Sequence, residues 1–165
     1  MKLYVLRHGV AEDISSDGDD ASRRLTPAGR RKMRAAAAGM RALGLRFDLI
    51  LTSPFARAAE TAAIVAEALG GDPLPQELPA LEQGVAPVET VRALQPFSRY
   101  ERVVIVGHEP GLSGVLSLLL TGSPGGLRIV LKKGGLVALE TQDPTRAGAA
   151  LRWMLTPRQL RHLGA

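Results

Sequence analysis

The chain has 165 residues, no cysteine and a formal net charge of +5. A chain of this length fits one domain and can bury a full hydrophobic core without covalent staples. The absence of cysteine excludes disulfides, a thiolate nucleophile and cysteine-ligated zinc. It also suits a reducing compartment, so we expect a cytoplasmic protein. No apolar stretch is long enough to span a membrane, and the N-terminus does not have the pattern of a signal peptide.

A strongly basic chain is a feature of proteins that bind nucleic acid, so nucleic acid has to be considered as a partner. Most of the excess is arginine, gathered at residues 23–24 and 30–34. There is no zinc-finger spacing, and six aromatic residues are spread along the chain (one Trp, two Tyr, three Phe), so stacking platforms for bases are not expected. We interpret the basic residues as a solvated helix face. The alternative is a surface that steers an anionic substrate or an acidic partner protein.

The first part of the chain alternates between strand and helix patterns. Residues 2–6, which are apolar from Leu3 onward, predict a buried strand, whereas residues 10–24 are polar and acidic and predict a loop. Thr26 and Pro27 combine an N-cap with proline at the first helical position, which predicts a helix over 27–44. Residues 47–52 predict a short strand. A second cap-plus-proline signal at Ser53-Pro54 predicts a helix over 54–69, and the proline-rich residues 72–87 predict an irregular segment.

The second part adds a short helix, a strand and a buried helix, then three short strands: 88–95, 102–106, 111–121, 128–132, 135–141 and 149–155. A turn at Asp143-Pro144-Thr145 joins the last two strands, and Thr156-Pro157 begins a final short helix. The alternation of strands and helices predicts an α/β fold. We expect one domain over residues 1–165, in three α/β/α layers with a mostly parallel central sheet.

Two of the three histidines follow the end of an apolar strand pattern, with one residue between the pattern and the histidine. His8 comes after residues 2–6, and His108 comes after residues 102–106. In an open α/β sheet, ligand sites form at the carboxyl ends of the strands. This shared placement predicts a catalytic centre with two histidines. The third histidine, His162, lies near the C-terminus and is expected at the surface.

The polar groups near these strand ends predict a pocket for a phosphoryl group. Guanidinium groups bind phosphate oxygens through paired, charge-assisted hydrogen bonds, and helix N-termini add positive potential. A neutral imidazole can attack phosphorus and form a phosphohistidine intermediate. We expect neither a metal nor a cofactor, because the arginines and the second histidine carry the compensating charge. The candidate residues are Arg7, His8, Arg57 and His108, with Glu82 and Arg23 as further candidates.

Three motifs in this order resemble the histidine phosphatase superfamily, also called phosphoglycerate mutase-like. They are Arg7-His8-Gly9, the segment from Ser53 to Thr61 with the pattern Ser-Pro-x-x-Arg-Ala-x-x-Thr, and Val106-Gly107-His108. Within it, the chain is most similar to the short phosphohistidine phosphatases of the SixA type. This narrower resemblance rests on the chain length and on two further segments, Arg23 to Gly29 and Trp153 to Pro157.

The resemblance implies a role for each matching residue. His8 would be the nucleophile, and Arg7 and Arg57 would bind the phosphoryl oxygens. His108 would donate a hydrogen bond to the same oxygens, and Arg23 matches a subgroup arginine that reaches the phosphate. The resemblance also implies the phosphoglycerate mutase-like fold.

The role of Glu82 affects which class of substrate is expected. Larger members of the superfamily place an acid in this region to protonate an alkoxide leaving group. Glu82 could be that acid, or it could be a solvated loop residue. Because the P–N bond of phosphohistidine is labile, an enzyme acting on it can manage without a strong acid. A short chain also leaves an open pocket, which suits a side chain projecting from a folded protein.

We therefore expect a phosphatase acting on phosphohistidine in a signalling or phosphotransfer protein. One alternative is a phosphomonoesterase for small molecules on the same fold. A less favoured one is a non-catalytic phosphate-binding module. The partner would be a phosphorylated protein or a small phosphate ester, without nucleic acid or membrane, and the protein is expected to be a monomer.

Overall fold

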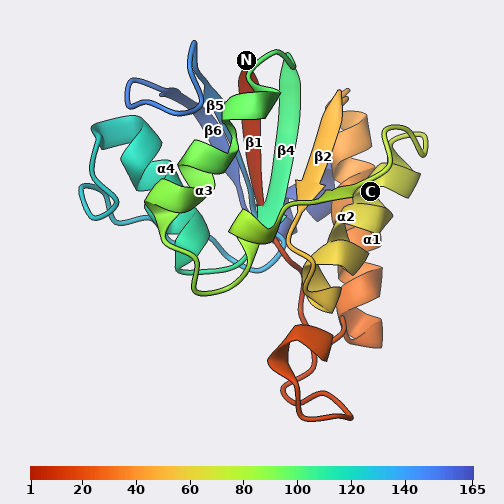
Figure 1. Cartoon of the computed structure of the whole chain (residues 1–165). Coiled ribbons are helices and arrows are strands. Elements are labelled where there is room, and N and C mark those ends of the chain that lie inside the picture. The colour runs from red at the N-terminus through yellow and green to blue at the C-terminus, as the bar shows by residue number, and fades with distance from the viewer.

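The computed structural model describes all 165 residues and contains one mixed sheet of six strands, in the order β3-β2-β4-β1-β5-β6. The strands are β1 (Lys2–Arg7), β2 (Leu49–Thr52), β3 (Gln76–Glu77), β4 (Arg102–Gly107), β5 (Leu136–Glu140) and β6 (Ala150–Leu155). The pairs β1·β4, β4·β2 and β2·β3 are parallel, whereas β5 and β6 are antiparallel additions at one edge. The carboxyl ends of β1, β2 and β4 point to the same edge of the sheet (Figure 1).

Helices cover both faces of the sheet and complete the three layers predicted from the sequence. They are α1 (Pro27–Ala42), α2 (Ala56–Ala68), α3 (Pro87–Ala93), α4 (Gly111–Thr121) and α5 (Pro157–Leu163). Side chains of α1, α2 and α5 pack into one core cluster, and those of α3 and α4 pack into a second. Figure 1 shows α1 and α2 on one side of the strands and α3 and α4 on the other. The predicted α/β/α fold is confirmed. No helix in it combines the length and the apolar character needed to cross a bilayer.

The burial of β1 explains why it reads as a continuous apolar run. Successive side chains of a strand point to opposite faces, and here both faces are covered by helices. Tyr4 and Leu6 enter the cluster beneath α1 and α2, whereas Leu3 and Val5 enter the cluster beneath α3 and α4. A strand buried on both faces is apolar at every position rather than at alternate ones.

The structure corrects three predicted elements. The segment 128–132 is not a strand: its carbonyls at Ile129 and Leu131 lie within hydrogen-bond distance of the side chains of Ser113 and Arg7, and it pairs with no strand. Residues 72–87, expected to be irregular, contain β3, which extends the sheet beside β2. The second helix begins at Ala56, two residues later than its predicted start.

Candidate active site

The register of β1 and β4 brings the two strand-end histidines together. Arg7 is paired with Gly107 across the two parallel strands, and the backbone N–H of His8 donates to the Gly107 carbonyl at 3.1 Å. The imidazole rings of His8 and His108 have their centroids 5.0 Å apart. Both residues are buried, with 5% and 4% of their surface exposed. The predicted pair of histidines therefore exists as a spatial unit.

His8 has a defined protonation state and tautomer. Its Nδ1 lies 2.7 Å from the Gly9 carbonyl oxygen. A carbonyl only accepts hydrogen bonds, so Nδ1 carries the proton. Burial, together with the neighbouring positive charges, lowers the pKa of His8 from 6.5 to about 3. The imidazole is thus neutral at neutral pH, and its Nε2 keeps a free lone pair.

His108 is held by Ser53, which follows the end of β2. The Nε2 of His108 lies 2.8 Å from the Ser53 hydroxyl oxygen, which also accepts from the Phe55 N–H at 3.2 Å. Ser53 is therefore not the cap of α2: the N-cap is Phe55, which makes no side-chain cap hydrogen bond. Burial, followed by the charge of Arg57, lowers the pKa of His108 to about 4.

Arg57 lies in the first turn of α2 and is almost completely enclosed, with 1% of its surface exposed. Its Nη1 donates to the Asp20 carbonyl at 2.7 Å, and its Nη2 donates to the Asp20 carboxylate at 2.9 Å and to Gln83 Oε1 at 2.6 Å. The guanidinium carbon lies 5.3 Å from the centre of the Phe55 ring. Three of the five N–H donors of Arg57 are therefore used, and two remain for a ligand.

Asp20 joins two arginines near the site. Its carboxylate accepts from Arg57 and, at 2.7 Å, from Nη1 of Arg23. Hydrogen bonding to Arg23 first, and to Arg57 next, lowers the pKa of Asp20. The carboxylate thus brings Arg23, a candidate from the sequence, next to Arg57. Asp20 was not predicted from the sequence, because the acidic stretch around it has the composition of a solvated loop.

Arg7 approaches the histidines from the end of β1. Its Nη1 donates to the Leu131 carbonyl at 2.9 Å. Burial lowers the pKa of Arg7, and the charge of Glu109 opposes this effect. The Nε of Arg7 and the Nδ1 of His108 are both buried without a hydrogen-bond partner. Unpaired buried polar atoms are uncommon, so these two nitrogens are candidates for contact with a ligand.

Glu82 follows the short 3₁₀ turn Pro79–Leu81 and is half-buried. It lines a small cavity together with His108, Val85 and Gly111. The structure therefore brings Glu82 near the histidine pair. His162 is exposed on α5. No group of three or more His, Cys, Asp or Glu side chains is arranged to hold a metal ion.

Together these groups can bind a tetrahedral anion. Buried guanidinium groups supply positive charge and directional donors for phosphoryl oxygens, and a neutral imidazole beside them supplies a nucleophile. Such a site stabilises the charge on a phosphoryl group during transfer. The fold and this chemistry together define the class as a phosphoryl-transfer enzyme on an α/β/α scaffold.

Comparison with known proteins gives the family. Residues 3–83 match the model of the histidine phosphatase superfamily, branch 1. An uncharacterized protein of Picosynechococcus sp. is 38% identical over 156 residues, covering 91% of this chain and 87% of that protein. The chain belongs to the histidine phosphatase superfamily, and it is a phosphatase.

Solved structures agree on the fold. The protein histidine phosphatase SixA, complexed with tungstate, superposes with a TM-score of 0.85 at 21% identity, covering 97% of this chain and 99% of that one. A phosphoserine phosphatase from Entamoeba histolytica superposes with a TM-score of 0.71 at 17% identity, covering 96% and 98%. At these identities the likeness establishes the phosphoglycerate mutase-like fold and leaves the substrate open.

Proposed function

We propose that the protein is a phosphohistidine phosphatase in which His8 is the nucleophile. The observation that carries this proposal is the neutral, buried imidazole of His8, with Nδ1 bound to the Gly9 carbonyl. In the first step, the Nε2 lone pair forms a bond to phosphorus while the P–N bond of the substrate breaks. The leaving imidazole keeps the electron pair and takes a proton from solvent. In the second step, water forms a P–O bond, the His8–phosphorus bond breaks, and phosphate is released.

The arginines and His108 would stabilise the transferred group. Arg7 and Arg57 each keep unused N–H donors. For His108 to donate to a phosphoryl oxygen, its proton must lie on Nδ1, the buried atom without a partner. The Ser53 hydroxyl can enforce this tautomer by donating to Nε2, 2.8 Å away. Arg23 would contribute through Asp20 or, after a small movement, directly.

Phosphohistidine is favoured as substrate for chemical reasons. Its P–N bond breaks readily, so the leaving group does not require a strong acid, and Glu82 makes no hydrogen bond that would fix it for this role. The fold also matches that of a protein whose described activity is on phosphorylated histidine in proteins. The second candidate is a small-molecule phosphomonoesterase, and the position of Glu82 beside His108 in one small cavity supports it.

We further propose that residues 1–165 act as one domain on a phosphorylated protein. A single sheet links both core clusters, which supports this view. The monomeric state and the cytoplasmic location expected from the sequence stay predictions.

A labelling experiment tests the nucleophile. The protein is mixed with a radiolabelled phosphohistidine protein, quenched in alkali and mapped by mass spectrometry. We expect label on His8, stable to alkali and labile to acid, and none in His8→Asn. His162→Asn serves as the matched control, because His162 is exposed on α5, and it should label normally. Label on another residue, or turnover by His8→Asn, would contradict the mechanism.

A substrate panel tests the specificity. Phosphohistidine proteins, phosphoserine peptides and phosphorylated metabolites are compared by kcat/KM. We expect phosphohistidine to be preferred, and Glu82→Gln to leave its hydrolysis unchanged. Strong loss of ester hydrolysis in Glu82→Gln, with esters as the better substrates, would favour the small-molecule candidate instead.

A further inference from the structure

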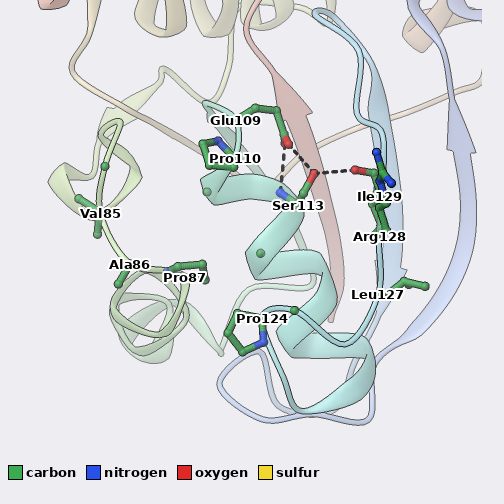
Figure 2. Close-up of a pocket in the computed structure, with 14 residues that line it drawn as sticks. Val85, Ala86, Pro87, Glu109, Pro110, Ser113, Pro124, Leu127, Arg128 and Ile129 are labelled. Atoms are coloured by element: carbon green, nitrogen blue, oxygen red, sulfur yellow. Dashed lines mark hydrogen bonds between the residues drawn. The ribbon is translucent and has the colours of Figure 1, made fainter.

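A pocket with a volume of about 630 Å³ lies beside the candidate active site. Three segments form its walls: residues 84–87, residues 109–114 at the start of α4, and residues 124–129. Figure 2 shows Glu109 and Ser113 together at one end and Pro124 and Leu127 at the other. A pocket of this volume accommodates a small molecule or a projecting side chain.

The pocket adjoins the small cavity that His108 borders. Glu109 directly follows His108, and Val85 and Gly111 line both this pocket and the small cavity that His108 borders. Glu109 is also close enough to Arg7 for its charge to oppose the lowering of the Arg7 pKa by burial. A group attached to a phosphoryl at His8 therefore has this pocket as its neighbour.

The Glu109 carboxylate is fixed in place. One oxygen accepts from the Ser113 backbone N–H at 3.1 Å, and the other accepts from the Ser113 hydroxyl, which also lies 3.2 Å from the Ile129 carbonyl (Figure 2). A carboxylate can accept about four hydrogen bonds, so capacity remains for a ligand. Glu109 forms no ion pair with a cationic side chain.

The other charged residue of the lining is Arg128. It lies in the 124–129 wall, is exposed, and forms neither an ion pair nor a side-chain hydrogen bond. An exposed and unfixed cation is solvated and contributes little to a specific contact. The fixed charge nearest His108 in this pocket is therefore negative.

We propose that Glu109 determines specificity, admitting substrates with an N–H donor or a cation next to the phosphoryl group and rejecting those with a carboxylate there. This inference rests on the proposed function, because it assumes that the phosphoryl group binds at His8. The imidazole of a phosphohistidine side chain meets the requirement, since its second ring nitrogen can donate a hydrogen bond to the carboxylate. A phosphorylated hydroxy acid does not meet it, because its carboxylate would face Glu109.

Phosphoethanolamine and phosphoserine test this selection, since they differ by one carboxylate. Each is measured as a competitive inhibitor of p-nitrophenyl phosphate hydrolysis, so no phosphohistidine substrate is needed. We expect the wild type to bind phosphoethanolamine about tenfold more tightly, because two like charges in contact repel. Glu109→Gln should bring the ratio of the two inhibition constants close to one. The control Glu89→Gln, on the exposed side of α3, should keep the wild-type ratio.

Arg128→Gln provides a second test that leaves the hydrogen bonds at the start of α4 intact. It should keep the preference for phosphoethanolamine. The proposal is overturned if the wild type binds the two compounds equally, if neither compound inhibits, or if Arg128→Gln rather than Glu109→Gln changes the ratio. A failure of the proposed function is recognised separately: phosphohistidine would lose its advantage in the substrate panel while the ratio of inhibition constants stayed as expected.

Discussion

Mild acid should destabilise this protein through its two buried histidines. Burial lowers the pKa of His8 to about 3 and that of His108 to about 4, whereas an unfolded histidine has a pKa of 6.5. As the pH falls below 6.5, the unfolded chain binds protons that the folded chain does not. The stability that the two neutral histidines contribute is therefore fully present above pH 6.5, and it is lost progressively as the pH falls toward their folded pKa values of about 4 and 3. At pH 5.5, one unit below the ordinary value, each imidazole favours unfolding by about 1.4 kcal/mol.

The two histidines together should therefore cost about 3 kcal/mol between pH 7.5 and 5.5, out of a typical stability of about 5–15 kcal/mol. Urea denaturation at both pH values measures this loss. His8→Asn and His108→Gln should each remove about half of it, and the exposed control His162→Gln should keep it in full. The chosen range stays above the pH at which carboxylates take up protons. A wild type equally stable at both pH values would refute the reasoning.

Two further predictions concern contacts that the sequence did not reveal. Asp20→Ala should lower the free energy of unfolding by about 1 kcal/mol, because it leaves buried Arg57 without its carboxylate; the value is discounted because the Asp20 side chain is 49% exposed. Inorganic phosphate should restore this stability in urea denaturation. A loss of stability that phosphate does not reduce would contradict an anion site at Arg57. Gly39→Ala should destabilise by about 3 kcal/mol or more in the same assay, because its Cβ would lie 1.8 Å from the Leu160 carbonyl oxygen of α5. Gly125→Ala has nothing within 4 Å of its Cβ and should show no comparable loss.

Local patterns predicted the scaffold well, because they report burial and capping directly. The apolar run before His8 became β1, and Thr26 caps α1 as expected, accepting from the Gly29 N–H. The Thr156-Pro157 signal was confirmed with a full capping box on α5. The placement of His8 and His108 after two strands predicted their proximity, since neighbouring parallel strands end at one edge.

Long-range side-chain contacts could not be predicted in this way. Ser53-Pro54 carries a helix-start signal, yet the Ser53 hydroxyl contacts a histidine 55 positions away. The segment 128–132 has strand-like residues, but the Arg7 side chain of β1 donates a hydrogen bond to its carbonyl at Leu131. Asp20 lies 37 positions from Arg57, so only the folded loop shows that this carboxylate contacts a candidate site residue. In each case a polar group forms a hydrogen bond with a residue far away in the sequence, so the local pattern does not reveal the contact.

The burial that makes the protein sensitive to acid also prepares the proposed chemistry. A solvated histidine is partly protonated near neutral pH, and a protonated imidazole has no lone pair with which to attack phosphorus. Removing His8 from water keeps it neutral, and the Gly9 carbonyl leaves Nε2 as the free nitrogen. An incoming phosphoryl group adds negative charge beside His108, which opposes the effect of burial and favours a donating imidazole at the moment of transfer. The acid sensitivity and the reactivity at neutral pH thus depend on the same desolvation. A variant that admits water to this pocket should be more stable at low pH and less active at neutral pH.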